Sequence, residues 1–269
     1  MYVAIDIGGT KTLVCALTNE GVIREQVKFP TPQTYPAWLE TLQATLDEFE
    51  HKTFKAGGVA APGAINRDTQ EVLYLGNLPW KNIQLPHDVA KITKCPMVME
   101  NDAKLAGLSE AMLVKHTYKR VLYVTLSTGI GLGLVEDGRI DTNLGDGGGK
   151  SIMIEHEGKL VPWESFAAGS AIVKKYGKMA SEIDDAQTWK AIVRNLVPGF
   201  LELIAILEPE VIIVGGGAGR YLPKFHDFLV SDLKKYETPL LTIPPIQVAE
   251  RPDEAVIYGC YDYAKQHFA

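Results

Sequence analysis

Two glycine-rich turns, at residues 6–10 and 127–129, constrain the fold of this 269-residue chain more than any other feature. Each turn lies between two short apolar runs: residues 2–7 and 13–17 for the first, 122–126 and 130–135 for the second. Such a pattern is typical of a strand, a tight turn and a second strand. With Ile5 set beside Val124, the two segments run in parallel. We interpret this as an internal repeat that builds two similar halves, with chance likeness of two glycine-rich hairpins as the alternative.

Length and composition agree with two globular domains. At roughly 150 residues per domain, the chain is long enough for two. Hydrophobic residues make up 46% and charged residues 22%, which excludes a disordered chain. The net charge of −6 argues against a protein that wraps DNA or RNA. We expect no nucleic-acid partner.

No apolar run approaches the roughly 18 residues of a membrane span. The first residues carry no basic segment, so we expect no signal peptide, no membrane association and a cytoplasmic location. The three cysteines, Cys15, Cys95 and Cys260, are far apart and odd in number. They indicate reduced thiols rather than a disulfide framework.

The remaining segments alternate between strand-like and helix-like patterns, which indicates an α/β fold. We expect further strands at 22–29, 56–61, 211–214 and 246–249, and helices at 36–50, 103–114, 165–179, 188–207, 223–235 and 252–267. No low-complexity linker divides the chain. A domain boundary must therefore be a tight crossover, which we place near residues 111–118.

The first turn has the chemistry of a phosphate-binding loop. Successive N–H groups at Gly8 and Gly9 can cradle phosphate oxygens, while Thr10 adds a hydroxyl donor and Lys11 a cation. Asp6, at the strand end, is placed to hold Mg²⁺ through water. Neither a Walker A loop nor a G-x-G-x-x-G motif is present. A glycine hairpin turn with a solvated aspartate is the alternative.

Two later glycine motifs offer further cradles. Thr128 and Gly129 belong to a Ser-Thr-Gly-Ile-Gly-Leu-Gly segment, and Gly215, Gly216 and Gly217 end an apolar strand before a helix-like run. A helix N-terminus preceded by glycines suits the phosphate or sugar edge of a nucleotide. Each motif is weak alone, but three in one chain favour a nucleotide-binding protein.

These three motifs resemble the phosphate-1, phosphate-2 and adenosine motifs of the actin, hexokinase and heat-shock ATPase superfamily. Within it, the chain resembles the ROK family (repressor, open reading frame, kinase) of bacterial sugar kinases. The segments that carry this narrower likeness come in the family's order: Ala61-Pro62-Gly63, Asn77-Leu78-Pro79-Trp80, Glu100-Asn101-Asp102-Ala103, Glu208-Pro209-Glu210 and Tyr258-Gly259. The resemblance implies two ribonuclease-H-like (actin-like ATPase) domains with an interdomain cleft. It also implies a terminal helix that returns to the first domain, which places the domains at 1–112 plus 253–269 and at 113–252.

Asp102 is the predicted catalytic base. It ends an apolar strand before a helix-like run, where α/β proteins usually carry their chemistry. Phosphoryl transfer to a hydroxyl needs a carboxylate that accepts the proton, and the resemblance gives Asp102 that role. Asn101 would hydrogen-bond the sugar, whereas we expect Glu100 to be structural. The alternative is helix capping, which Asn and Asp favour and which can coexist with catalysis.

The resemblance places the Gly63 backbone and the Asn77 side chain at the sugar, although a turn without a ligand role is the alternative for Gly63. ROK kinases usually carry E-x-G-H at a later position. Here Gly147 stands at the Glu position and Lys150 at the His position, with Asp146 one residue away as a partial replacement. This departure suggests an acidic or differently substituted sugar, or weakened sugar binding.

The family's cysteine-rich zinc motif is also lost, since residues 157–166 contain no cysteine. We therefore expect no zinc site. The Glu-His-Glu segment at 155–157 has the wrong spacing for a sugar site, and we interpret it as a solvated polar turn. Glu164 matches the position after the zinc motif and is a candidate for binding sugar hydroxyls, with a surface glutamate at a helix start as the alternative.

We therefore expect an ATP- and Mg²⁺-dependent kinase that phosphorylates a sugar hydroxyl, and, from the resemblance, a homodimer. A non-catalytic nucleotide or sugar sensor of the same fold is the main alternative. A ROK-type repressor is disfavoured, because the chain begins with a strand and is acidic. A kinase for a non-sugar substrate is disfavoured by the segments that carry the narrower likeness.

Overall fold

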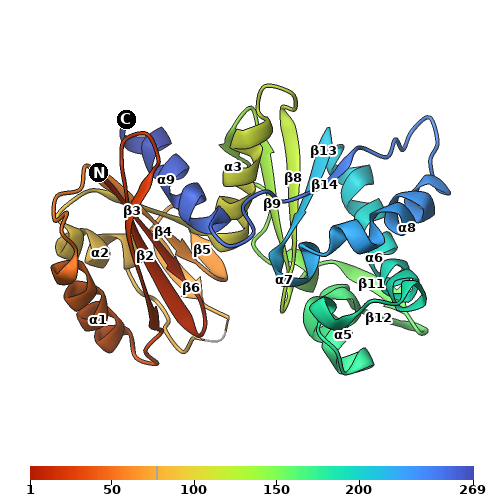
Figure 1. The fold of residues 1–269 in the computed structure, drawn as a ribbon, viewed down its shortest axis with the longest axis horizontal. Coiled ribbons are helices and arrows are strands. Elements are labelled where there is room, and N and C mark those ends of the chain that lie inside the picture. Colours follow the sequence, from red (N-terminus) through yellow and green to blue (C-terminus); the bar gives the residue numbers. More distant parts are fainter. Residues whose placement is uncertain (77) are drawn as a thin grey trace. The chain divides into compact units, whose positions relative to one another are not determined.

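The computed structural model describes residues 1–76 and 78–269 and forms two compact units (Figure 1). Unit 1 comprises Met1–Ser109 and Asp253–Ala269, and unit 2 comprises Glu110–Pro252. The division falls inside helix α3 (Asp102–Val114), so this helix carries the chain from one unit to the other. The domain limits expected from the sequence, 1–112 plus 253–269 and 113–252, describe parts that fold independently, and they stay a prediction.

Each unit is built on a five-stranded sheet, and the two sheets share one topology. Their strand orders are β3-β2-β1-β4-β7 and β10-β9-β8-β13-β14. In both, the first three strands are antiparallel and the last two are added in parallel. The strands are β1 (Tyr2–Ile7), β2 (Lys11–Leu17), β3 (Ile23–Pro30), β4 (Ala56–Ala61), β7 (Met97–Asn101), β8 (Arg120–Leu126), β9 (Ile130–Glu136), β10 (Arg139–Ile140), β13 (Val211–Gly215) and β14 (Ile246–Val248). The internal repeat predicted from the glycine-rich turns is therefore confirmed.

Alternation along β1 explains why unit 1 has helices on both faces of its sheet. Val3 and Ile5 belong to the core beneath helices α1 (Tyr35–Glu48) and α2 (Leu85–Thr93). Tyr2 meets Tyr261 of α9 (Ala255–Phe268) edge to face, with ring centroids 5.3 Å apart. Residues that alternate along a strand lie on opposite faces, so β1 is buried from both sides.

The C-terminal helix α9 packs against β1 and β4 of unit 1 (Figure 1). Two glycines allow this close approach. A Cβ on Gly58 of β4 would lie 2.4 Å from the Cys260 carbonyl oxygen, and one on Gly259 would lie 2.0 Å from that of Leu105. Real Cβ contacts are never so short, so a side chain at either position would push the helix away.

Unit 2 packs its helices around long α6 (Ala186–Leu207), which lies against α8 (Leu222–Lys234) and α4 (Glu164–Ala167). The single helix predicted at 165–179 is wrong. Ala168 is extended, with ψ 166°, and separates α4 from α5 (Gly169–Tyr176). The break follows from tertiary contact, because Gly169 N–H donates to the Ser127 carbonyl at 2.7 Å.

The solvated polar turn predicted at 155–157 is part of a hairpin, β11 (Met153–His156) and β12 (Lys159–Pro162). Its two-residue turn, Glu157-Gly158, has positive φ at both positions, as a type I′ hairpin requires. A second hairpin, β5 (Ala64–Asn66) and β6 (Glu71–Tyr74), follows β4 in unit 1.

The three cysteines are buried, free thiols. Across residues 1–76 and 78–269, we find no helix with the length and apolar character needed to cross a bilayer.

Candidate functional site

In unit 1, the turn between β1 and β2 is held by a buried polar network. Gly8 N–H donates to the Lys11 carbonyl at 2.9 Å, which closes the turn. Thr31, just after β3, donates its hydroxyl to the Gly8 carbonyl at 2.8 Å and its N–H to the Thr10 carbonyl at 3.0 Å. The backbone of the turn is thus fixed from outside, while its Thr10 and Lys11 side chains are exposed.

Two further side chains support Thr31. Its hydroxyl lies 3.0 Å from the buried Thr12 hydroxyl, which accepts a hydrogen bond from Trp38 Nε1 at 3.1 Å. Sequence reasoning missed this support. The available signal was a pair of threonines, one in β2 and one just after β3, that the three-stranded meander brings close together beside the candidate phosphate loop.

Asp6, the predicted Mg²⁺ residue, is half-buried near the end of β1. Burial, with the negative charge of Asp102 as the second cause, raises its pKa from 3.8 to about 7, against a smaller opposite effect of Lys28. The two carboxylates repel each other where water is partly excluded, and a bound divalent cation would relieve this repulsion. These residues therefore fit Mg²⁺ held by few carboxylates and several waters.

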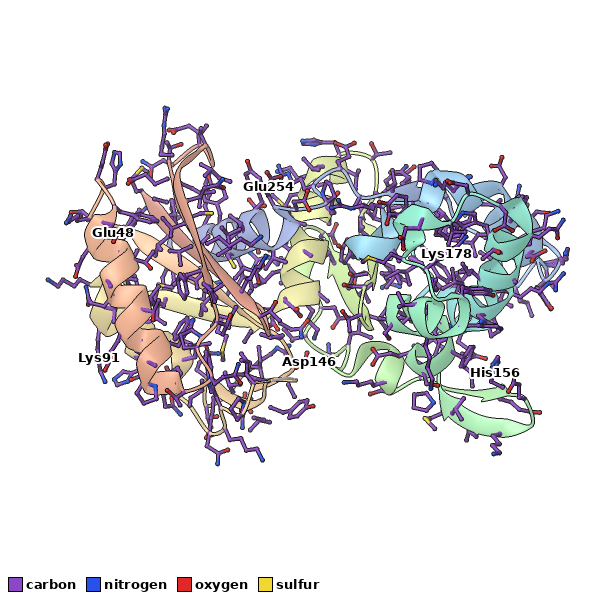
Figure 2. The ribbon with its side chains drawn as sticks, turned by 60° about the horizontal axis from the view of Figure 1, so that its bottom comes forward. Glu48, Lys91, Asp146, His156, Lys178 and Glu254 are labelled. Carbon is purple, nitrogen blue, oxygen red and sulfur yellow. The ribbon has the colours of Figure 1, made fainter. Side chains whose placement is uncertain are left out.

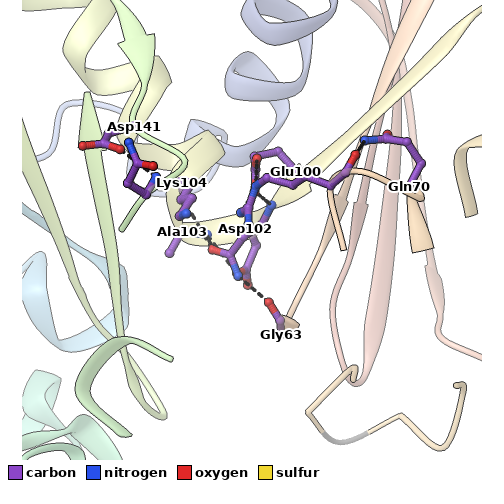
Figure 3. A network of polar contacts seen from close by, with 10 residues as sticks. Gly63, Gln70, Glu100, Asp102, Ala103, Lys104 and Asp141 are labelled. Atoms are coloured by element: carbon purple, nitrogen blue, oxygen red, sulfur yellow. Dashed lines mark hydrogen bonds and ion pairs between the residues drawn. The ribbon is translucent and has the colours of Figure 1, made fainter. Parts of the chain in front are cut away.

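Asn101 and Asp102 lie where β7 runs into α3 (Figure 3). Asn101 Oδ1 accepts hydrogen bonds from the N–H groups of Ala103 at 2.9 Å and Lys104 at 3.3 Å, so Asn101 caps the helix. Its Nδ2 donates to the Gly63 carbonyl at 3.0 Å. Asp102 is half-buried and accepts from Ala103 N–H at 2.8 Å. Both side chains thus accept hydrogen bonds from the first turn of α3, so capping, the alternative for this segment, coexists with a half-buried Asp102 carboxylate at the strand end.

Gly63 follows Pro62 in the turn between β4 and β5, with φ 123°. The Asn101 contact brings this turn beside the strand end that carries Asp102. Two segments expected at the sugar are thus neighbours in unit 1. Asn77, the third predicted sugar residue of this half, lies outside the described residues.

In unit 2, the second glycine turn and the start of α5 meet at a cavity. Ser170 Oγ donates to the Thr128 carbonyl at 2.6 Å, which fixes the turn against the helix. The cavity has a volume of about 310 Å³ and is lined by Ser127, Thr128, Gly169, Ser170, Val173, Met179, Ala180, Ser181, Gly217, Ala218, Arg220 and Tyr221. Apolar side chains with a few polar groups among them suit a planar base joined to a sugar.

The cavity brings together Thr128 and Gly217 from two of the predicted nucleotide motifs. Gly129, Gly215 and Gly216 do not line it, and the last two pack against β8. A Cβ on Gly215 would be 2.2 Å from the Tyr123 hydroxyl oxygen. Sequence reasoning missed Ser170, Met179 and Tyr221, because residues of α5 and of the segments after α5 and α7 (Gly216–Gly219) carry no motif.

Gly216→Ala is expected to lower the free energy of unfolding by about 1–3 kcal/mol. Gly216 has φ 84°, and a Cβ there would lie 2.4 Å from Thr125 Oγ1. Gly217→Ala is the matched control, since nothing lies within 4 Å of its added Cβ. Urea unfolding of both variants measures the difference. Equal stability of the two would contradict the strained conformation assigned to Gly216.

Glu164 and Lys150 are brought together at the second glycine turn. Glu164 Oε2 accepts from Ile130 N–H at 2.8 Å, and its Oε1 lies 3.9 Å from Lys150 Nζ. The carboxylate is so close to Gly129 that a Cβ there would lie 2.3 Å from Oε2. Glu164 is therefore a support of the turn, and one of its oxygens faces an exposed lysine.

The short 3-10 helix Gly148–Lys150 carries Lys150, and exposed Gly147 and half-buried Asp146 precede it (Figure 2). His156 of β11, labelled in Figure 2, stacks on Phe166 with ring centroids 4.0 Å apart. Within the described ranges, no group of three or more His, Cys, Asp or Glu side chains is placed to hold a metal ion. Residues 157–166, where the resemblance places the zinc motif of the family, form the hairpin turn, strand β12 and the start of α4.

The model of the ROK family matches residues 2–267. The chain belongs to the ROK family. Among its curated relatives are an N-acetylgalactosamine kinase of Shewanella sp. (strain ANA-3), 25% identical over 81% of this chain and 82% of that protein, and a glucokinase of Streptomyces coelicolor, 23% identical over 99% and 98%. A ROK family glucokinase of Streptomyces griseus, solved with glucose and AMPPNP, has a TM-score of 0.80 at 21% identity over 98% of this chain and 99% of that one.

These likenesses confirm the fold predicted from the three glycine motifs and the family predicted from the further segments that resemble ROK kinases. The ROK chain is a mixed α/β protein with the actin-like ATPase fold, and its two sheets repeat the ribonuclease-H-like strand order.

Proposed function

We propose that this ROK protein transfers the γ-phosphoryl group of ATP to a hydroxyl of a hexose or hexose derivative. The placement of Asp102 carries the proposal. Its half-buried carboxylate lies at the end of β7, beside the Gly63 turn that is expected to bind the sugar. It is also close enough to Asp6 for its negative charge to raise the pKa of the Asp6 carboxyl. The curated relatives named above, a glucokinase and an N-acetylgalactosamine kinase, support a sugar as the acceptor.

In this mechanism, Asp102 accepts the proton of the sugar hydroxyl as the hydroxyl oxygen attacks the γ-phosphorus. The new O–P bond forms while the bond from the γ-phosphorus to the bridging oxygen breaks, which releases ADP. Phosphoryl transfer depends mainly on positioning and on charge stabilisation. The backbone of Gly63 and the Asn77 side chain orient the sugar, whereas Asn101 holds the Gly63 turn and the start of α3.

We assign the adenosine to the unit 2 cavity, with Thr128 and Gly217 on its wall. Gly9, Thr10 and Lys11 supply donors for phosphate oxygens, whereas Gly8, whose N–H closes the turn on the Lys11 carbonyl, shapes the backbone beside them. Asp6 would hold Mg²⁺ through water, and the bound cation would neutralise charge on the phosphoryl oxygens. Gly129, Gly215 and Gly216 shape the backbone around these groups.

Lys150 and Glu164 are proposed to contact the sugar from unit 2. Lys150→Ala is expected to change the ratio of kcat/KM values among neutral and acidic sugars at least fivefold, while KM for ATP stays within twofold. Lys190→Ala is a control on an exposed lysine of α6, which lies over the Phe228 ring. A uniform change across all sugars would assign Lys150 a surface role.

A non-catalytic sensor of nucleotide or sugar is the second candidate, favoured by the loss of E-x-G-H around Gly147 and Lys150. ADP release in the presence of MgATP separates the two across a panel of neutral hexoses, N-acyl amino sugars and sugar acids. Turnover with one class of sugar supports the kinase. No ADP release with any sugar of the panel, while ATP still binds, would instead support the sensor. The cytoplasmic location and the homodimer stay predictions.

A further inference from the structure

An ion pair between half-buried Arg67 and buried Glu100 lies directly behind the catalytic strand end. Glu100, fully buried at the end of β7, accepts two hydrogen bonds from Arg67: one from Nε to Oε2 at 2.8 Å, and a second from the Nη2 atom to Oε1. Oε1 also accepts from Asn101 N–H at 2.7 Å. A two-pronged Arg–carboxylate contact fixes orientation as well as distance.

Arg67 is itself held in place by the turn of the β5–β6 hairpin. Asn66 Oδ1 accepts from the N–H groups of Asp68 at 3.0 Å and Thr69 at 3.1 Å, which forms an Asx turn. Gln70 Nε2 donates to the Arg67 carbonyl at 2.8 Å (Figure 3). The backbone that carries the Arg67 guanidinium is thus fixed by hydrogen bonds within the hairpin turn.

These contacts close a ring. The chain runs from Gly63 through β5 to Arg67, and the ion pair crosses to Glu100. The next residue, Asn101, returns to Gly63 through its 3.0 Å hydrogen bond to the carbonyl. Asp102 is attached to this ring at Asn101. The ring joins the end of β7, which carries Asp102, to the Gly63 turn, so neither segment can shift without the other.

We infer that Arg67 and Glu100 are positioning residues, whose ion pair sets the place of the Asp102 carboxylate relative to the Gly63 turn. This inference rests on the proposed function. Sequence reasoning assigned Glu100 a structural role and did not single out Arg67. A buried ion pair adds little to stability compared with apolar side chains of similar volume. We therefore attribute the role of this pair to geometry, since a displacement of about 1 Å can lower a rate about 100-fold.

The test uses three variants. Glu100→Gln keeps the shape but removes the charge, Arg67→Lys keeps the charge but removes the two-pronged contact, and Arg67→Met combined with Glu100→Gln removes both charges. Arg67→Met alone would leave a buried carboxylate unpaired and could fail to fold. Lys91→Met is the matched control, because Lys91 forms an exposed ion pair with Asp88 in the same unit, at 3.2 Å.

Rates are measured at least 10 °C below the melting temperature of each variant, so that folding losses do not enter. We expect Glu100→Gln and the double variant to lower kcat about 10–100-fold, with KM for MgATP within twofold of the wild type. Arg67→Lys should retain an intermediate kcat, and Lys91→Met should leave kcat unchanged. A merely structural role would lower the melting temperature without this separation of kcat from KM.

The failures are distinguishable. A wild type that turns over, with an inactive Asp102→Asn and a fully active Glu100→Gln, would overturn the inference and leave the kinase in place. A wild type with no turnover that depends on Asp102 would overturn the proposed function, and the positioning role with it.

Discussion

Asp102→Asn is expected to lower kcat by about 10²–10⁴-fold while the Kd for ATP stays within twofold. The amide keeps the size of the side chain but does not accept the proton of the sugar hydroxyl. The helix should survive the change, because Asn101 still caps α3 and the amide oxygen of asparagine can accept from Ala103 N–H as the Asp102 carboxylate does. Steady-state rates and calorimetric titration with ATP measure the two quantities.

Asp68→Asn is the control, since Asp68 lies exposed on the turn of the β5–β6 hairpin of the same unit. Its kcat should match that of the wild type. An Asp102→Asn variant with wild-type turnover would show that another group accepts the proton.

Asp6→Asn is expected to raise the free energy of unfolding of the nucleotide-free protein by about 2–4 kcal/mol at pH 8. Folded Asp6 has a pKa of about 7, against 3.8 as its ordinary value, chiefly because of burial. The folded state therefore binds this proton more tightly than the unfolded chain. The contribution of Asp6 to the free energy of unfolding is fully present below pH 4, and it is lost as the pH rises to about 7. Asparagine carries no ionisable group, so the variant does not lose this stability as the pH rises.

Urea unfolding at pH 4.5 and pH 8, with EDTA present, measures this effect. The gain from Asp6→Asn should be small at pH 4.5 and near its maximum at pH 8. The exposed Asp68→Asn variant should show no such dependence. A gain that is equal at both pH values would contradict the raised pKa. Because Asp6 also belongs to the proposed Mg²⁺ site, the more stable variant should be a poorer kinase, as expected where function retains a strained group.

The repeated half-molecule could be predicted from the sequence because both of its signals are local. Apolar runs that end in glycine turns identify β1–β2 and β8–β9, and the matched positions Ile5 and Val124 are fully buried in equivalent strands. The strand ends that carry Asp6 and Asp102 followed from the same reasoning. Their electrostatic coupling did not, since it depends on how β1 and β7 are placed in one sheet.

The features that sequence reasoning missed depend on long-range contacts. The break at Ala168 has no helix-breaking residue before it and arises where Gly169 donates to Ser127. The ion pair of Arg67 and Glu100 joins residues 33 positions apart, and neither belongs to a motif with a known partner. Lining residues of the unit 2 cavity such as Tyr221 are found only when the helices are placed around it.

Direct detection of the product tests the central claim most sharply. The protein is incubated with MgATP and each sugar of the panel, and the mixture is examined by ³¹P NMR and mass spectrometry. The account predicts a new phosphomonoester on one class of sugar, formed in equal amount with ADP, and its absence with Asp102→Asn. Bound ATP that is left intact, or hydrolysed to inorganic phosphate with no sugar phosphate, would contradict it.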